Sequence, residues 1–419
     1  MRYVIVGAGP AGVVAAETLR LQDPGGEVLL IGGEPGPAYS RMAIPYLLAE
    51  QIGESGTYLR HNADHFERLG IAQLQAWVTG VDSQNRTLHL GSGDRLSYDR
   101  LLLATGSRPV MPPVAGLTQP GIHHCWTLED ARHIAGQAKP GSRVLLMGAG
   151  FIGCILMESL VKRSVELTVI EMGDRMVPRM MDQVAGNLIK RWCIGRGVEV
   201  RTSTRALSVA PNTSGEAKFL LQCEASDPIP ADLIVVATGV APAIDFLEGS
   251  GIDCAQGVLV DHCLQSSVPG VYAAGDACEA IDSSTGERVV HAIQPVAVET
   301  GRVAALNMAG VETPYIGGMA MNVLDTLGLV STSYGQWRGV PGGETASLLD
   351  EERFRYINLQ FQEERLIGAI TLGITEHVGV LRGLIQSQLR LGDWKQRLLV
   401  DPSRIMEAYL AATQISANA

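Results

Sequence analysis

The chain opens with two short apolar runs separated by a glycine-rich turn and an amphipathic stretch. Arg2–Val6 reads RYVIV, and residues 27–31 read EVLLI. Near-continuous apolar runs of this length are typical of strands buried in a parallel sheet. Residues 7–20 begin with a turn that contains three glycines within six residues, and they continue as a predicted helix. The opening therefore predicts a β-turn-α-β unit.

The same order of elements recurs in the middle of the chain. Arg143–Met147 and Glu166–Ile170 are predicted strands, and residues 148–161 are predicted to form a glycine-rich turn and a helix. Each unit is followed by an apolar strand that ends in Ala-Thr-Gly, LLLATGSRP at 101–109 and LIVVATGVAP at 233–242. We therefore expect an α/β fold with two nested Rossmann-like dinucleotide-binding domains.

Beyond residue 314 the pattern changes. Residues 322–333 and 355–361 are predicted strands, and residues 375–391 a helix. Asp401 is expected to cap a last helix that has Pro402 at its first position. These elements predict a smaller C-terminal α+β domain from about residue 318.

Composition narrows the classes of function. The chain has 419 residues, 46% of them hydrophobic, which is enough for two or three domains. Its net charge of −11 argues against nucleic-acid binding. The longest apolar stretch, 144–161, contains glycines and Glu158, so no membrane span is expected. The first motif leaves no room for a signal peptide, and a cytoplasmic protein is the default.

Seven cysteines are scattered along the chain without a C-x-x-C pair or a zinc-like spacing with histidine. This pattern is typical of reduced thiols in a cytosolic protein. No metal site is therefore expected.

The glycine motifs have a spacing that suits a dinucleotide pyrophosphate. In GAGPAG (residues 7–12), Gly7 allows the tight turn, Gly9 the close approach of the pyrophosphate, and Gly12 the helix–strand packing. Glu34, at the end of the second strand, is placed to accept hydrogen bonds from a ribose diol. The helix N-terminus offers free N–H groups to the phosphates.

The second motif, GAGFIG (residues 148–153), has Glu171 as its strand-end acid. A carboxylate there accepts from a ribose 2′-hydroxyl and repels a 2′-phosphate, so NADH is favoured over NADPH. Arg175 is close enough in sequence to accommodate the phosphate, so NADPH stays open.

These motifs, the paired Ala-Thr-Gly strands and the late VYAAGD strand (271–276) together resemble the pyridine nucleotide-disulfide oxidoreductase superfamily. PAYSR (37–41), HAIQPVAVE (291–299) and GRVA (301–304) are similar to the NADH-dependent nitrite reductase flavin module and to rubredoxin and ferredoxin reductases. The resemblance implies FAD on residues 1–112 and 242–317, NAD(H) on 113–241, and an interface domain at 318–419 that forms a homodimer. It also implies that the helix after residue 291 points its N-terminus at the flavin.

The predicted cofactor-binding residues follow from the motifs and the resemblance. For FAD they are Gly7, Gly9, Pro10, Ala11, Gly12, Glu34, Arg41, Val78, Thr105, Gly106, Gly275 and Asp276. For NAD(H) they are Gly148, Gly150, Ile152, Gly153, Glu171 and Gly239.

Three departures from the family pattern bear on the chemistry. Met42 stands where oxidases and coenzyme A disulfide reductases carry a reactive cysteine, so thiolate chemistry has no nucleophile. Carrier reductases often have a lysine near Pro45, and it is absent here. Ile155 replaces a glutamate beside the nicotinamide, and Glu158, one helical turn on, is the only candidate catalytic residue.

We therefore predict an FAD-dependent NAD(P)H oxidoreductase that passes hydride from NADH to flavin and electrons to a carrier protein or partner reductase. Two alternatives stay open: a non-turnover FAD subunit that wires a larger redox complex, and an NADH oxidase or direct small-molecule reductase. Between residues 377 and 404 the chain has five basic residues and only two aspartates, which gives this stretch a local positive charge. A positive surface suits an acidic electron-carrier protein as the partner. Ordinary dimer-surface or solvated charge is the alternative for that stretch.

Overall fold

The computed structural model describes residues 1–213, 215 and 217–417. The chain divides into two compact units, Met1–Pro109 with Val240–Gly318, and Val110–Gly239 with Met319–Ala419. It thus leaves the first unit after residues 109 and 318, close to the predicted boundaries at 112 and 317. The assignment of one nucleotide to each part stays a prediction.

A five-stranded parallel sheet forms the centre of the first unit. Its strand order is β19 (Val271–Ala273), β7 (Arg100–Leu103), β1 (Arg2–Val6), β2 (Glu27–Gly32) and β3 (Ile71–Gln75). The chain runs from β1 to β2 and β3 on one side, and then places β7 and β19 on the other. β1 therefore lies at the switch point of the sheet, where open α/β sheets bind ligands at the strand carboxyl ends.

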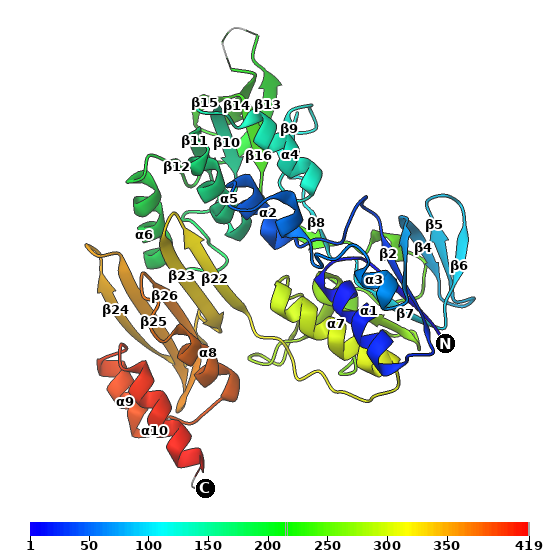
Figure 1. Cartoon of the computed structure of the whole chain (residues 1–419). Helices are drawn as coiled ribbons and strands as arrows, with labels where there is room; N and C mark the ends of the chain where they lie inside the picture. Colours follow the sequence, from blue (N-terminus) through cyan, green and yellow to red (C-terminus); the bar gives the residue numbers. More distant parts are fainter. Residues whose placement is uncertain (214, 216, 418–419) are drawn as a thin grey trace. The chain divides into compact units, whose positions relative to one another are not determined.

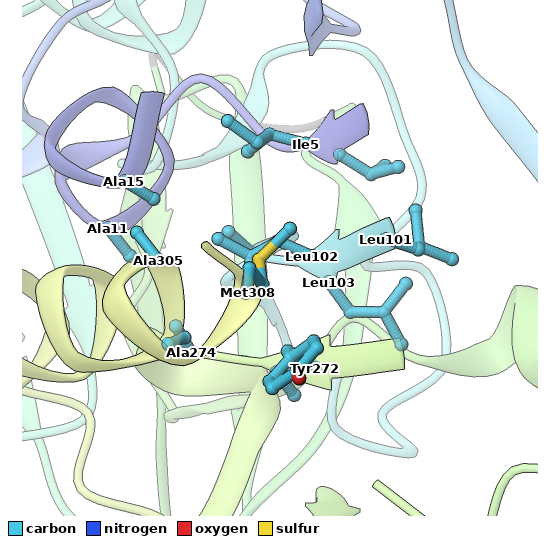
Figure 2. Packing of buried hydrophobic residues seen from close by; sticks show 14 of the residues in the cluster. Ile5, Ala11, Ala15, Leu101, Leu102, Leu103, Tyr272, Ala274, Ala305 and Met308 are labelled. Atoms are coloured by element: carbon cyan, nitrogen blue, oxygen red, sulfur yellow. The ribbon is translucent and has the colours of Figure 1, made fainter. Parts of the chain in front are cut away.

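Two helices pack together beside this sheet. They are α1 (Pro10–Gln22) and α7 (Gln294–Met308), shown in Figure 1. A Cβ atom on Gly301 would lie 2.4 Å from the Ala11 carbonyl oxygen, so the helices touch through their backbones. Figure 2 shows side chains of both helices, including Ala15 and Met308, among the buried residues of the sheet. This packing places the first turn of α1 against the middle of α7.

Shorter elements complete the first unit. They are η1 (Arg41–Ala43), α2 (Ile44–Leu48), η2 (Glu54–Thr57), α3 (His65–Arg68), β4 (Val78–Asp82), β5 (Thr87–Leu90), β6 (Arg95–Ser97), β8 (Ser107–Pro109), β17 (Val240–Pro242), η3 (Asp245–Leu247), β18 (Val258–Leu259), η4 (Gly275–Ala277), β20 (Cys278–Ile281) and β21 (Arg288–Val289). β8 and β17 pair antiparallel, at the two points where the chain leaves and re-enters the unit.

The second unit repeats the first arrangement. Its parallel sheet has the order β12 (Glu199–Arg201), β11 (Glu166–Ile170), β10 (Arg143–Met147), β16 (Leu233–Val236) and β9 (Ile122–His124). Helices α4 (Leu128–Gln137), α5 (Phe151–Lys162) and α6 (Gln183–Ile194) join them, as does a small sheet of β13 (Ala206–Pro211), β14 (Phe219–Cys223) and β15 (Ser226–Ala231). The predicted α/β class with two Rossmann-like repeats is confirmed.

The C-terminal part of the second unit is an antiparallel sheet with three helices. The strand order is β22 (Met321–Thr326), β23 (Leu329–Gly335), β26 (Arg365–Leu372), β25 (Arg355–Gln362) and β24 (Glu344–Asp350). The helices are α8 (Val378–Ser387), α9 (Asp393–Val400) and α10 (Ile405–Ala417). This is the expected α+β composition.

The strand character predicted for residues 322–333 is confirmed, but a turn that the pattern does not predict divides the stretch into a hairpin. Leu327 (φ +53°) and Gly328 (φ +84°) form this tight turn between β22 and β23. One prediction for this region is wrong. The last helix begins at Ile405 rather than at Pro402. Asp401 instead accepts hydrogen bonds from the N–H (3.1 Å) and hydroxyl (2.6 Å) of Ser403, which forms a turn after α9.

Among the described residues no helix is both long enough and apolar enough to cross a membrane. The described part of the chain likewise holds no cluster of three or more His, Cys, Asp or Glu side chains suited to a metal ion.

Candidate dinucleotide-binding sites

The turn between β1 and α1 uses its three glycines in two different ways. A Cβ atom on Gly7 (φ +116°) would lie 2.0 Å from the Ala104 carbonyl oxygen, and one on Gly12 would lie 1.8 Å from the Gly7 carbonyl oxygen. These two glycines are thus required by packing of the protein itself. A Cβ atom on Gly9 would meet no atom within 4 Å. Gly9 therefore faces open space, where a glycine lets a ligand approach the backbone closely.

The N-terminus of α1 is suited to an anion. Gly9 is the N-cap and provides no side-chain cap, and Pro10 occupies the first turn. The free N–H groups and the positive end of the helix dipole favour a phosphate at this point. Ala11 is buried against Gly301 of α7, so its side chain packs within the protein. We call the open backbone at Gly9 together with the free N–H groups at the start of α1 the first cradle. Its open space and its donors fit a dinucleotide pyrophosphate.

Glu34 and Arg41, both predicted contacts, lie together beyond β2. Arg41 Nη2 donates to Glu34 Oε1 at 2.5 Å, and the Tyr39 hydroxyl donates to Glu34 Oε2 at 2.5 Å. Arg41 Nη1 also donates to the Tyr39 hydroxyl at 2.8 Å. The carboxylate is thereby held in place while part of it stays exposed, at 28% of the side chain. It can still accept a hydrogen bond from a ribose hydroxyl.

Asp276 lies in η4, next to the first turns of both helices. Burial raises the pKa of Asp276 above its ordinary value, although the Ser107 hydroxyl, 2.6 Å from Oδ2, and the charge of Arg41 oppose this effect. The preceding Gly275 (φ +68°) donates its N–H to Thr300 Oγ1 of α7 at 2.9 Å. Asp276 and Arg41 therefore lie close enough for their charges to interact.

The remaining predicted FAD contacts lie at the ends of strands. The Thr105 hydroxyl donates to the Ala243 carbonyl at 2.8 Å, and a Cβ atom on Gly106 (φ +70°) would meet nothing within 4 Å. Val78 begins β4 and is half-buried. The sequence did not point to its neighbour Trp77 as a site residue. The Trp77 ring lies on Gly33, directly before Glu34, and is 65% exposed.

The turn between β10 and α5 has the same geometry as the first. A Cβ atom on Gly148 (φ +103°) would lie 2.5 Å from the Ala237 carbonyl oxygen, and one on Gly153 would lie 2.0 Å from the Gly148 carbonyl oxygen. Gly150 again faces open space, with no atom within 4 Å of its Cβ position. The second unit therefore repeats the open turn, the second cradle, whose geometry fits a dinucleotide pyrophosphate. Of the other two predicted contacts, Ile152 is half-buried in the first turn of α5, and Gly239 follows β16 with φ +116°.

Glu171 holds the strand end beside this second turn. Its Oε2 accepts the Ala149 N–H at 2.9 Å, and its Oε1 accepts the Gly173 N–H at 2.8 Å. Arg175, the residue that left NADPH open, donates to the Met181 carbonyl (3.0 Å) and to Asp174 (2.8 Å). Its guanidinium is therefore already engaged, which favours the interpretation of Glu171 as a barrier to a 2′-phosphate.

We expect wild-type protein to reduce its flavin faster with NADH than with NADPH. Glu171→Gln removes the charge and keeps one carbonyl oxygen, which can accept one of the two N–H groups, so the NADH preference should narrow by about tenfold, the equivalent of 1.4 kcal/mol. Stopped-flow reduction at matched concentrations measures the ratio. An unchanged ratio in a folded variant would show that Glu171 does not select the nucleotide.

The candidate catalytic residue Glu158 lies on α5 in an ordinary helix-surface ion pair. Its Oε1 is 2.6 Å from Lys162 Nζ, one turn further along, and the Glu158 side chain is 32% exposed. The structure therefore gives Glu158 a structural partner, and its catalytic role stays a prediction that no contact supports.

The two positions where a reactive thiol was considered hold none. Met42, in the position of the family's reactive cysteine, is 46% exposed in η1. Cys278, two residues after Asp276, is buried, and burial raises the pKa of its thiol to about 12. Such a thiol stays protonated at neutral pH and is a poor nucleophile.

Alkylation of the native protein is expected to leave NADH-dependent flavin reduction intact. Only Cys254 is exposed and Cys263 partly so, while the other five cysteines are buried. A thiol reagent should therefore modify at most two sites, which intact-mass spectrometry counts, and neither coenzyme A disulfide nor glutathione disulfide should be turned over. Loss of activity that parallels modification would reveal a reactive thiol.

The positive stretch between 377 and 404 is largely neutralised by glutamates from elsewhere in the chain. Lys395 pairs with Glu344, and Arg390 Nε lies 3.9 Å from Glu364. Beyond the stretch, Glu407 lies 3.3 Å from Arg404. The local excess of basic residues in sequence is therefore not an equal excess of free charge.

Comparisons with known proteins agree with this geometry. The family model described as pyridine nucleotide-disulphide oxidoreductase matches residues 1–295. The epsilon subunit of NADH-dependent phenylglyoxylate dehydrogenase from Aromatoleum evansii is 31% identical over 417 residues, 98% of each chain. The ferredoxin–NAD(+) reductase component of the biphenyl dioxygenase system from Paraburkholderia xenovorans is 34% identical over 281 residues, 65% of this chain and 66% of that protein.

The fold is also that of a solved reductase. The covalent putidaredoxin reductase–putidaredoxin complex aligns with a TM-score of 0.90 at 24% identity, over 98% of this chain and 99% of the matched chain. The family match covers most of the chain and includes both glycine turns. The chain therefore belongs to the pyridine nucleotide-disulphide oxidoreductase family and is an FAD-dependent oxidoreductase of NAD(H).

Proposed function

We propose that this protein is an NADH-dependent reductase of a one-electron carrier protein of the ferredoxin or rubredoxin type. The observation that carries the proposal is the pair of open glycine cradles, one in each unit, in a chain related to a ferredoxin reductase over 281 residues. FAD supplies the chemistry, since it accepts hydride from NADH and releases electrons one at a time.

The protein's own residues serve to bind and orient. In the first unit, the N–H groups at the start of α1 would hold the FAD pyrophosphate, with Glu34 on the ribose and Asp276 near the flavin side of the cofactor. In the second unit, the start of α5 and Glu171 would hold NADH. No side chain is assigned as acid, base or nucleophile, because hydride transfer between stacked rings requires none.

Anaerobic addition of NADH tests the first half of the reaction. We expect the flavin absorbance to bleach, and a subsequently added [2Fe–2S] ferredoxin or rubredoxin to be reduced with recovery of oxidised flavin. Bleaching with ferricyanide turnover but without reduction of either carrier would exclude the carrier assignment. Rapid reoxidation by oxygen alone would instead indicate an NADH oxidase.

A second candidate is a FAD-containing subunit of a larger redox complex. The end-to-end match to a dehydrogenase epsilon subunit favours it. The version without turnover predicts no bleaching by NADH. A version that feeds electrons to partner subunits predicts bleaching, together with co-purification of other redox subunits from native extract.

The proposal extends to an acidic carrier, a homodimer and a cytoplasmic location. Arg382 and Arg397 are the basic residues of the 377–404 stretch for which the structure shows no carboxylate pair among the described contacts, and Arg397 lies 4.6 Å from the Trp394 ring centre. Carrier reduction should slow as salt rises, because exposed charges are screened over about 8 Å at physiological ionic strength. Equal rates for wild type and Arg382→Glu/Arg397→Glu at low salt would remove this surface from consideration.

A further inference from the structure

A buried histidine–aspartate pair lies just before α7. His291 Nε2 is 3.0 Å from Asp282 Oδ2, which is an ion-pair distance, although the nitrogen makes no well-aligned hydrogen bond, and the two side chains are 9% and 4% exposed. Asp282 Oδ1 accepts the N–H (2.7 Å) and hydroxyl (2.5 Å) of Ser284 and the N–H of Thr285 (3.1 Å). Burial alone would raise the pKa of Asp282, but the contact with His291 and the hydrogen bonds from Ser284 outweigh it and lower the pKa to about 2. The carboxylate is therefore ionised and fully engaged.

The pair packs against the last residues of the first unit. Ser283 donates its N–H to the Gly318 carbonyl at 2.6 Å. A Cβ atom on Gly318 would lie 2.7 Å from His291 Cδ2 and 2.9 Å from the Tyr315 hydroxyl oxygen, so the imidazole rests directly on the Gly318 backbone. His291 is thus clamped between the Asp282 turn and residues 315–318.

On its other side, His291 leads into the helix that borders the first cradle. The N–H of Ile293 donates to the His291 carbonyl at 2.9 Å, and α7 begins at the next residue, Gln294. Gln294 Oε1 accepts the Ser40 hydroxyl at 2.8 Å, beside Arg41. One turn on, Ala297 packs against Gly275, beside Asp276. The first turn of α7 therefore contacts Ser40 and Gly275, the residues that directly precede the predicted FAD-binding residues Arg41 and Asp276.

We propose that Asp282 and His291 are a positioning pair for FAD, which fixes the turn before α7 and thereby the placement of this helix N-terminus at the cofactor. The inference rests on FAD binding by the first unit, as proposed above. A released turn would let Gln294 and Ala297 shift relative to Ser40 and Gly275, which loosens the cradle. It would also move the positive end of the α7 dipole, which influences the charge that the reduced flavin can hold.

Two substitutions of His291 test the pair. His291→Leu removes the polar contact with Asp282, whereas His291→Gln keeps a side-chain N–H that can face the carboxylate. Fluorescence titration of apoprotein should show the FAD dissociation constant raised about ten- to hundredfold in the leucine variant, the range expected when a buried charge loses a polar partner. The flavin midpoint potential of the reconstituted protein should shift as well. The glutamine variant should restore both values to near those of wild type.

His65→Leu is the matched control, since it breaks another histidine–carboxylate contact of the same unit, His65 Nε2 to Glu17 Oε1 at 2.7 Å. It should leave FAD affinity and potential unchanged. If His291→Leu does not fold by circular dichroism, Ser284→Ala removes a single donor from Asp282 and should raise the dissociation constant by a smaller factor.

Wild-type affinity and potential in folded His291→Leu or Ser284→Ala would overturn the proposal. Equal defects in the leucine and glutamine variants would also overturn it, because they would assign the effect to packing of the ring. Failure of wild-type apoprotein to bind FAD would instead overturn the proposed function, and it is seen without any variant.

Discussion

A Gly9→Val variant is expected to fold normally and to purify without its yellow colour. Gly9 has extended backbone (φ −79°, ψ −174°), which valine adopts readily, and its Cβ position faces open space. The added side chain therefore occupies only the volume that the pyrophosphate needs. The ratio of FAD to protein should fall below about 0.1, because the backbone can no longer be approached closely.

The stability of this variant is what makes the test informative. Exchange of a glycine N-cap for a poor one costs about 1 kcal/mol, which is small beside the 5–15 kcal/mol of a typical domain. Gly53→Val is a matched control, since Gly53 has the same extended backbone (φ −76°, ψ 171°), caps η2 in the same unit and also faces open space. It should keep its FAD. Stoichiometric FAD in folded Gly9→Val would refute the assignment of the first cradle.

Half of the glycine pattern in the two turns was predictable because its constraint is local. Gly12 and Gly153 are required by the carbonyl oxygens of Gly7 and Gly148, five residues earlier in the same turn. Gly7 and Gly148 instead face the carbonyl oxygens of Ala104 and Ala237, which follow a neighbouring strand of the same sheet, so only the motif predicted them. The strands beside them were predictable because they are buried on both faces and hence continuously apolar.

Features that depend on distant contacts could not be read from the sequence. The bond of Ser107 to Asp276 joins residues 169 positions apart, and neither the spacing nor the residue types announce it. The basic stretch of the terminal helices was overestimated for the same reason, because Glu344 and Glu364 come from strands and turns earlier in the chain. The missed hairpin has a different cause, since Leu327 occupies a left-handed position that usually takes Gly, Asn or Asp.

A Gly150→Val variant is expected to keep its FAD and to lose reduction by NADH. Gly150 repeats the conformation of Gly9 (φ −77°, ψ −167°), and its Cβ position is likewise open. A valine there should therefore fold, retain the colour of the bound flavin and block the second pyrophosphate. We expect the rate of flavin bleaching by NADH to fall by at least about 100-fold, or 2.7 kcal/mol in transition-state binding.

Chemical reduction supplies the control for this variant. Dithionite reaches the flavin without the nicotinamide cradle, so it should bleach Gly150→Val and wild type equally, and a carrier protein added afterwards should be reduced at the same rate by both. Gly9→Val and Gly150→Val then separate the two halves of the molecule, since one loses the cofactor and the other only its reductant. Unimpaired bleaching of Gly150→Val by NADH would mean that the second cradle is not where NADH binds, and that the repeat of the fold is not a repeat of its function.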